Sequence, residues 1–192
     1  MITVPTKHLK AALLVAGKHD IRHYLNGVMI EASAAETRCV GLNGVAVAVL
    51  RHAVINEFIG EFIVPRDVVE AAIKAKLTDT VFEQLDAKHW MVNGAHRFAP
   101  VDGKFPSYRR VMPTQCSGQG GRGFSPEQFA LFGKIAQALG KDPASVTTHS
   151  NGGGTAAITI EDCPDFAGVI MPLNFTKAMG DNGLGVQGWA AQ

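Results

Sequence analysis

The feature that most restricts the fold of this 192-residue chain is a repeat of about 60 residues. Pro5, Pro65 and Pro126 each open an amphipathic helical pattern, and they lie 60 and 61 residues apart. Proline is favoured in the first turn of a helix, where its missing N–H removes no hydrogen bond. Self-similarity at a fixed period indicates that one supersecondary unit is used several times. The chain is therefore predicted to contain three copies of one unit.

Each unit is predicted to begin with an amphipathic helix. The helices are expected from Pro5 to about Gly17, from Pro65 to about Leu77 and from Pro126 to about Leu139. A helix with one apolar stripe packs that stripe against a sheet or a core. The stripes comprise Leu9, Leu13 and Ala16 in the first helix, Val69, Ile73 and Leu77 in the second, and Phe132, Ile135 and Leu139 in the third.

Three short strand patterns follow each helix. Asn-Gly pairs at positions 43–44, 93–94 and 151–152 lie between them, and Asn-Gly favours the type I′ turn of a hairpin. The strands are expected at Val28–Glu31, Thr37–Gly41 and Ala46–Leu50; at Val81–Leu85, His89–Val92 and His96–Ala99; and at Ser145–His149, Thr155–Ile160 and Ala167–Met171.

This order of elements predicts an α+β fold made of βαβββ units, with helices on one face of antiparallel sheets. The first two units fill residues 1–113, and the third fills residues 124–173. A Gly-rich linker is expected at 114–123, and a Gly-rich tail at 174–192.

Composition and motifs argue for binding rather than catalysis. The formal net charge is +1, and the three cysteines form no CxxC or Cys/His pattern with metal spacing. No phosphate-binding GxxxxGK loop, GxSxG elbow or HExxH motif occurs. The chain is expected to be non-catalytic and to use no metal or cofactor. With no signal peptide and no apolar run of the ~20 residues that span a bilayer, it is expected in the cytoplasm.

Basic residues fall on or beside all three predicted helices. If the helices share one face of the sheet, these cations share it too. They then form either an ordinary solvated helix face or a surface that follows DNA phosphates without reading bases. The set is Lys7, Lys10, Lys18, Arg66, Lys74, Lys76, Lys134 and Lys141.

Three segments are more specific than this general pattern. Residues 101–113, with the sequence VDGKFPSYRRVMP, closely resemble the end of the middle domain of the bacterial DNA polymerase III β sliding clamp. Residues 20–27 (DIRHYLNG) are similar to the start of the first strand of that domain, and residues 169–173 (VIMPL) to the C-terminal strand of the clamp. Residues 1–113 then resemble one clamp domain, and residues 124–173 resemble half of the next.

The resemblance implies a ring whose helices face double-stranded DNA, and a pocket that binds peptides of polymerases and repair proteins. Arg22, His23 and Tyr24 match a place where clamps touch DNA. The alternative for Tyr24 is a simple half-buried packing role. The pocket positions carried over are Leu25, Leu42, Gly44, Val47, Pro106, Arg110, Val111, Val169, Ile170, Met171, Pro172 and Leu173.

The sequence also departs from the clamp pattern. The Asp-Gly-His-Arg-Leu turn of clamps is here residues 43–47 (NGVAV), and the Arg that usually follows the Met-Pro motif is Asn174. Clamps have six such units per chain and twelve per ring, so three units per chain would need four chains. The resemblance therefore implies a self-associating DNA replication processivity or tethering factor. The rival hypothesis is a clamp paralogue that forms no ring, binds little DNA and acts as a partner-binding regulator or decoy.

Overall fold

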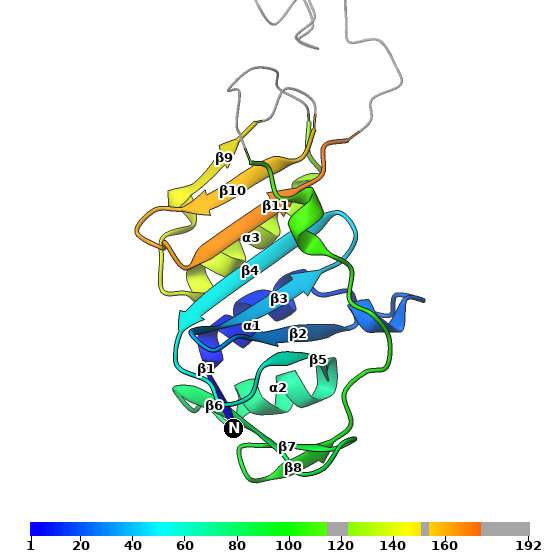
Figure 1. Cartoon of the computed structure of the whole chain (residues 1–192). Coiled ribbons are helices and arrows are strands. Elements are labelled where there is room, and N and C mark those ends of the chain that lie inside the picture. Colours follow the sequence, from blue (N-terminus) through cyan, green and yellow to red (C-terminus); the bar gives the residue numbers. More distant parts are fainter. Residues whose placement is uncertain (115–122, 151–153, 174–192) are drawn as a thin grey trace, which may run out of the picture.

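A computed structural model describes residues 1–114, 123–150 and 154–173 of the chain (Figure 1). None of its helices in these ranges is long and apolar enough to cross a membrane. The first unit comprises β1 (Ile2–Pro5), α1 (Thr6–Val15), β2 (Gly27–Ala32), β3 (Glu36–Leu42) and β4 (Ala46–Ala53). The second unit comprises β5 (Gly60–Pro65), α2 (Arg66–Lys74), β6 (Asp79–Gln84), β7 (Trp90–Val92) and β8 (His96–Phe98). The third unit comprises α3 (Pro126–Ala138), β9 (Val146–His149), β10 (Ala156–Ile160) and β11 (Phe166–Ile170). Short 3-10 helices lie at η1 (His23–Leu25), η2 (Tyr108–Val111) and η3 (Pro143–Ser145).

The three helices begin at residues 6, 66 and 126, so the structural period is 60 residues throughout. Pro5 and Pro65 end strands β1 and β5 and form the N-caps of α1 and α2. Pro126 is instead the first residue of α3, and Ser125 is the N-cap. Proline therefore occupies the first turn as predicted in α3, whereas Pro5 and Pro65 lie one residue earlier than the first turn.

The first two units interlock by exchanging their short first strands. The strand β1 pairs antiparallel with β6, and β5 pairs antiparallel with β2. As a result, each unit supplies the outer strand of the sheet that the other unit builds. The four-stranded sheet has the order β1-β6-β7-β8, and the seven-stranded sheet has the order β5-β2-β3-β4-β11-β10-β9.

The third unit extends the sheet of the first. Strand β11 pairs antiparallel with β4 along five residues, from Phe166 opposite Leu50 to Ile170 opposite Ala46. Residues 124–173 therefore share one continuous sheet with part of residues 1–113. Figure 1 shows this junction, with β11 beside β4 near the middle of the sheet.

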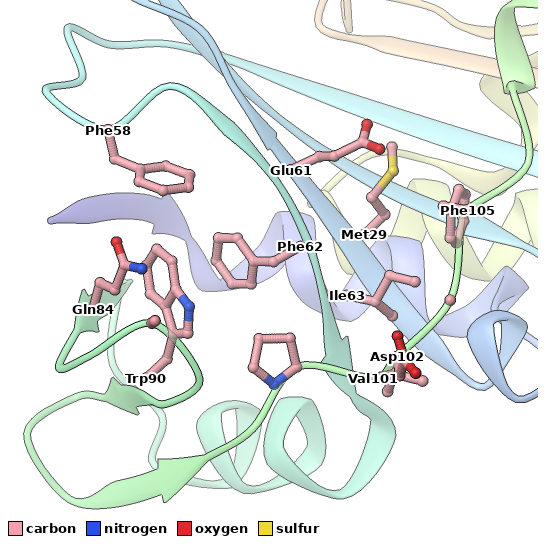
Figure 2. Close-up of a pocket in the computed structure, with 13 residues that line it drawn as sticks. Met29, Phe58, Glu61, Phe62, Ile63, Gln84, Trp90, Val101, Asp102 and Phe105 are labelled. Carbon is pink, nitrogen blue, oxygen red and sulfur yellow. The ribbon is translucent and has the colours of Figure 1, made fainter.

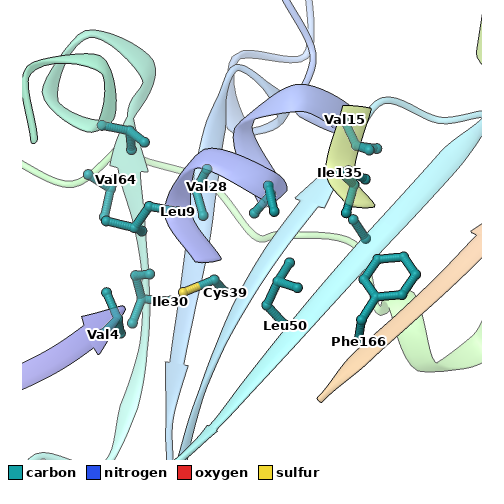
Figure 3. Packing of buried hydrophobic residues seen from close by; sticks show 14 of the residues in the cluster. Val4, Leu9, Val15, Val28, Ile30, Cys39, Leu50, Val64, Ile135 and Phe166 are labelled. Carbon is teal, nitrogen blue, oxygen red and sulfur yellow. The ribbon is translucent and has the colours of Figure 1, made fainter. Parts of the chain in front are cut away.

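All three helices contact one face of the seven-stranded sheet, as the sequence predicted, and α1 lies between α2 and α3. Alternate strand residues such as Val28, Ile30 and Leu50 pack under the helices (Figure 3). The helix α1 approaches the sheet so closely that a Cβ at Gly41 would lie 1.9 Å from the carbonyl oxygen of Ala12. Glycine at position 41 is thus required by the distance between helix and sheet.

The opposite face of the sheet carries a second, smaller apolar cluster. It includes Met29, Val40 and Ile63, and it is covered by the segment that leaves the four-stranded sheet after β8. Phe105 and Tyr108 of this segment are buried against the sheet. The segment 101–113, which carries the most specific part of the clamp resemblance, therefore lies on the sheet face that carries none of the three α-helices (the helix-free face).

The Asn-Gly turns differ from one another. Asn93 and Gly94 both have positive φ (51° and 64°), as a type I′ turn requires. Between β3 and β4 only Gly44 has positive φ, and the side chain of Asn43 accepts hydrogen bonds from the N–H groups of Val45 and Ala46. The type I′ prediction is wrong for that turn. The third pair, at 151–152, lies outside the described residues.

Candidate functional site

An apolar cavity of about 180 Å³ opens on the helix-free face, where β4 meets β11. Its walls come from the two paired strands, the β3–β4 turn and the segment around residues 106–111. Eight of the twelve predicted pocket residues line it: Leu25, Leu42, Gly44, Val47, Pro106, Val111, Val169 and Met171.

The other four predicted pocket residues do not line this cavity. Ile170 points to the opposite face, where it is fully buried under the helices. Alternation along β11 explains this difference, since neighbouring residues of a strand face opposite sides of the sheet. Arg110, Pro172 and Leu173 lie outside the cavity lining, and Arg110 and Leu173 are exposed.

Arg22, which was predicted as a DNA contact, lines the cavity. Its guanidinium donates to both carboxylate oxygens of Asp20, at 3.0 and 2.8 Å. These hydrogen bonds lower the pKa of Asp20 to about 2. A Cβ at Gly44 would lie 3.0 Å from the Arg22 guanidinium, so glycine gives this side chain room at the cavity wall. The cavity therefore has one cation, supplied by Arg22 rather than by Arg110.

Three further lining residues were missed in the sequence: Val45, Ser107 and Tyr108. Tyr108 donates to Glu31 at 2.8 Å and accepts from Arg38 at 3.3 Å. Burial acts to raise the pKa of Glu31, but hydrogen bonds from Arg109 and Tyr108 outweigh it and lower that pKa. This network fixes one wall of the cavity to β2 and β3. No local sequence pattern indicates this hydrogen-bond network, because Tyr108 is 70 residues or more from Arg38 and Glu31.

The rim of the cavity is tied to the third unit. The N–H of Met171 donates to the carbonyl oxygen of Val45 at 2.8 Å. The side chain of Asn43 donates to Gln128 of α3 at 2.7 Å. The cavity is thus lined by residues of all three units, and its shape depends on how the first and third pack.

On the helix side, the predicted basic residues are spread over three helices. Lys7 and Lys10 of α1, Lys74 of α2 and Lys134 of α3 are all exposed. In the described ranges, every ion pair uses arginine or histidine, and no lysine makes one. The helices also carry the acidic residues Asp67, Glu70 and Glu127.

Several predicted DNA-contact residues have other surroundings. Arg66 donates to the carbonyl oxygens of Ala16 and Gly17 at 2.8 and 2.9 Å, so it caps the C-terminal end of α1. Lys18, His23 and Arg66 line an open cleft of about 530 Å³ beside the start of α2. Lys76 is exposed just past the end of α2, and Lys141 is partly buried after α3. Tyr24 is half-buried and packs against the apolar cluster of the helix-free face, which agrees with the packing alternative.

A second pocket, of about 300 Å³, lies where β5 faces the four-stranded sheet (Figure 2). Phe62 stacks on Trp90 with ring centroids 4.1 Å apart, and Phe58 meets Trp90 edge-on at 5.1 Å. Glu61 and Asp102 add carboxylates to the lining. No residue of the predicted peptide pocket lies here. Among the described residues, no group of three or more His, Cys, Asp or Glu side chains is arranged to hold a metal ion.

No protein-family model matches the chain, and no curated protein matches it in sequence. Solved structures do match. The DNA polymerase sliding clamp of Pseudomonas aeruginosa, determined with a ligand, superposes with a TM-score of 0.71 at 17% identity, over 91% of this chain and 66% of that one. The DNA polymerase III β subunit of Thermotoga maritima gives a TM-score of 0.73 at 13% identity, over 91% and 65%.

The chain has the fold of a bacterial sliding clamp. This bears out the predicted fold and the resemblance of the chain to bacterial sliding clamps. The chain spans just under two thirds of the length of the clamps it matches. The same Pseudomonas clamp was also solved bound to griselimycin, and that structure superposes with a TM-score of 0.65.

Proposed function

We propose that this protein is a clamp-like DNA replication factor. It tethers partner proteins through the apolar cavity between β4 and β11, and it contacts duplex DNA through its helix face without reading sequence. The cavity carries this proposal, because it lies at the junction between units and is formed mainly by residues that the clamp resemblance had singled out.

The chemistry of the cavity suits a short hydrophobic peptide. Leu25, Val47 and Val169 form a buried apolar floor, while Val45 and Met171 are partly exposed at the rim. The flexible thioether side chain of Met171 at the rim can adapt to different apolar side chains of a bound peptide. The Arg22 guanidinium lies beside the floor, and its charge is balanced by the ion pair with Asp20. Its N–H groups that do not face Asp20 can donate to a carbonyl oxygen or carboxylate next to the apolar anchor of a peptide.

The helix face supports the DNA part of the proposal. Lys7, Lys10, Lys74 and Lys134 project from three adjacent helices, and none of them is neutralised by an ion pair within the described part of the chain. Unpaired ammonium groups on one face can replace the counterions of the phosphate backbone. Such contacts position a protein on DNA but carry no sequence information.

One observation favours the alternative, a partner-binding regulator that binds little DNA. Asp67, Glu70 and Glu127 lie on the same helices as the lysines. Their negative charge reduces the positive potential of the helix face. The peptide cavity is not affected by these acids, so partner binding would persist even if DNA binding were weak.

Fluorescence anisotropy with a labelled duplex of random sequence tests the proposal. The wild-type affinity should fall steeply with salt, with a slope of about −0.9 in log–log form for each phosphate contacted. Reversing four helix lysines together (Lys7→Glu, Lys10→Glu, Lys74→Glu and Lys134→Glu) should abolish binding.

The matched control reverses four exposed cations away from the helices: Lys88→Glu, Arg97→Glu, Lys104→Glu and Arg110→Glu. This variant has the same net charge as the helix variant, so it should retain most of the DNA affinity if the helix face is the contact. Equal loss in both variants would mean that only net charge matters. Wild-type protein that does not bind DNA, but does bind a polymerase-derived clamp-binding peptide, would favour the regulator.

A further inference from the structure

The pocket of about 300 Å³ lies at β5, which forms one end of the seven-stranded sheet. Phe62 and Ile63 are neighbours in β5, so their side chains face opposite sides of the sheet. They belong to two different apolar clusters, yet both line this pocket. A pocket that is lined from both faces of an end strand opens onto the outer edge of that strand (Figure 2).

The main chain of β5 is only partly used along this outer edge. The carbonyl oxygen of Ile63 accepts a hydrogen bond from the N–H of Val101 at 2.9 Å, so the main chain of residue 63 faces away from β2. Main-chain groups alternate in direction along an antiparallel strand, so Glu61 also directs its N–H and C=O groups outward. No residue in the described ranges bonds to these two groups of Glu61. An open length of strand edge is a template for another extended segment.

The pocket carries negative charge on one side of β5. Glu61 and Asp102 line it on the side opposite the aromatic rings (Figure 2). Both are exposed, and neither makes an ion pair with a described residue. Among the described residues, no Lys, Arg or His lines the pocket. A guanidinium binds carboxylates in a bidentate manner, and its aliphatic stem packs on apolar surface such as that of Met29 and Phe105. This side of the pocket therefore suits an arginine side chain.

The other side of β5 is aromatic. Phe58, Phe62 and Trp90 pack together there (Figure 2). Trp90 is only 3% exposed, and its indole N–H has no hydrogen-bond partner in the described part of the chain. Ile59 precedes β5 and is 68% exposed, which adds apolar surface beside Phe58. This side suits an apolar side chain, and the indole N–H can donate to a carbonyl oxygen that enters the pocket.

We propose that an extended segment of a partner protein pairs antiparallel with the outer edge of β5, and that this segment carries an arginine between two apolar residues. The arginine lies opposite Glu61, donates its main-chain N–H to the carbonyl oxygen of Glu61, and directs its guanidinium to the two carboxylates. Its two neighbours face the aromatic side, because side chains alternate along a strand. In such strand addition the main chain supplies affinity and the alternate side chains supply specificity.

This site is separate from the cavity between β4 and β11, since the two share no lining residue. It therefore goes beyond the proposed function and does not depend on it. A nuclear magnetic resonance titration of the isotope-labelled full chain tests it, with the peptide acetyl-Thr-Val-Arg-Val-Thr-amide as the probe. The main-chain amide of Glu61 and the indole N–H of Trp90 should shift in a saturable manner. A Trp189→Phe variant assigns the indole signal, because the chain has two tryptophans.

Two altered peptides separate the charge from the strand pairing. Replacing the arginine of the probe by citrulline removes the charge and keeps the shape, so binding should weaken at least tenfold. Methylating the main-chain nitrogen of that arginine removes the donor to Glu61 and should also weaken binding at least tenfold. N-acetylarginine amide cannot extend along β5. If it bound as tightly as the probe, strand pairing would be contradicted and the proposal overturned.

A pair of double variants tests the carboxylates. Glu61→Gln with Asp102→Asn should weaken binding of the probe at least tenfold. Glu127→Gln with Asp162→Asn is the matched control, since it changes the net charge equally at two exposed positions outside the pocket. This control should keep the wild-type affinity, and so should Met171→Asp in the other cavity.

Four results would overturn the proposal. The first is a wild-type protein that gives no saturable shift with millimolar probe. The second is equal affinity for the arginine and citrulline peptides. The third is an equal loss of affinity in the two double variants, which would indicate a general charge effect. The fourth is a set of shifts confined to the residues that line the cavity between β4 and β11.

Discussion

Val47 of β4 and Val169 of β11 lie directly opposite one another across the junction between the first and third units. Both are buried, and both form the floor of the apolar cavity. The pairing that joins the two units therefore also builds the cavity. A one-residue shift in the register of β11 against β4 would turn Val169 away from the cavity, since successive strand residues face opposite sides.

Met171→Asp should weaken the binding of a polymerase-derived clamp-binding peptide by at least tenfold. Met171 lines the cavity and is 40% exposed, so the fold should tolerate the change while an apolar anchor would meet a carboxylate. A tenfold loss corresponds to about 1.4 kcal/mol. Isothermal titration calorimetry would measure it.

Leu173→Asp provides the control for that experiment. Leu173 is two residues away and similarly exposed, at 38%, but it does not line the cavity. The substitution adds the same charge, so it should change the affinity by less than about threefold if contact with the cavity decides binding. Equal losses in the two variants would indicate a general charge effect and contradict the assignment of the cavity.

Arg66 and Lys74 were predicted together as DNA contacts, but the structure gives them different surroundings. Arg66→Met should lower the free energy of unfolding by about 1–3 kcal/mol, because it removes charge-assisted hydrogen bonds to the last carbonyls of α1. Lys74→Met should change it by no more than about 0.5 kcal/mol, since Lys74 is exposed. Urea unfolding would distinguish the two, and an equal effect would contradict the capping role.

Most helices and strands could be predicted from the sequence, because each has its own hydrophobic periodicity or turn residues. The nine strand patterns and three helical patterns all appear within a few residues of their predicted bounds. The strands β1 and β5 were not predicted with bounds, since each is a short run ending in proline. Their stability comes from pairing with the other unit, and no periodicity within one unit reports that pairing.

The resemblance to clamps predicted the pocket correctly only for residues whose side chains face the cavity in the folded chain. The run from Val169 to Leu173 was assigned to the pocket as a block, but a strand sends alternate side chains to opposite faces, and Ile170 lies under the helices. Arg22 was predicted as a DNA contact because residues 22–24 match a place where clamps touch DNA. Its hydrogen bonds to Asp20 instead hold it over Gly44, and only the folded chain brings Gly44 there.

Gly41→Ala tests how tightly the helix layer is seated on the sheet. The new methyl group would lie 1.9 Å from the carbonyl oxygen of Ala12, a distance that only movement of α1 or β3 can relieve. Unfolding should become easier by about 2–4 kcal/mol. Gly133→Ala is the comparison, because its methyl group would meet only Pro143 at 3.6 Å and alanine favours helix. Thermal unfolding that ranks the two variants the other way would contradict the close approach.

The last prediction concerns pH. His8 of α1 is buried, and its Nδ1 has no hydrogen-bond partner among the residues that the structure describes. Burial lowers the pKa of His8 to about 4, and Lys7 and His52 add to this effect while Asp165 opposes it. The folded-state pKa is thus below the ordinary value of 6.5. Between these two values the unfolded chain binds more protons than the folded one, so the free energy of unfolding falls as pH falls through this window.

His8→Leu should remove that part of the pH dependence. Between about pH 7 and about pH 4.5, the wild-type protein should lose roughly 2 kcal/mol more stability than the variant does. His96→Leu, at an exposed position on β8, should keep the wild-type dependence. Urea unfolding at the two pH values gives the comparison. If His8→Leu loses as much stability on acidification as the wild-type protein does, then His8 is not the group that remains neutral in the folded core.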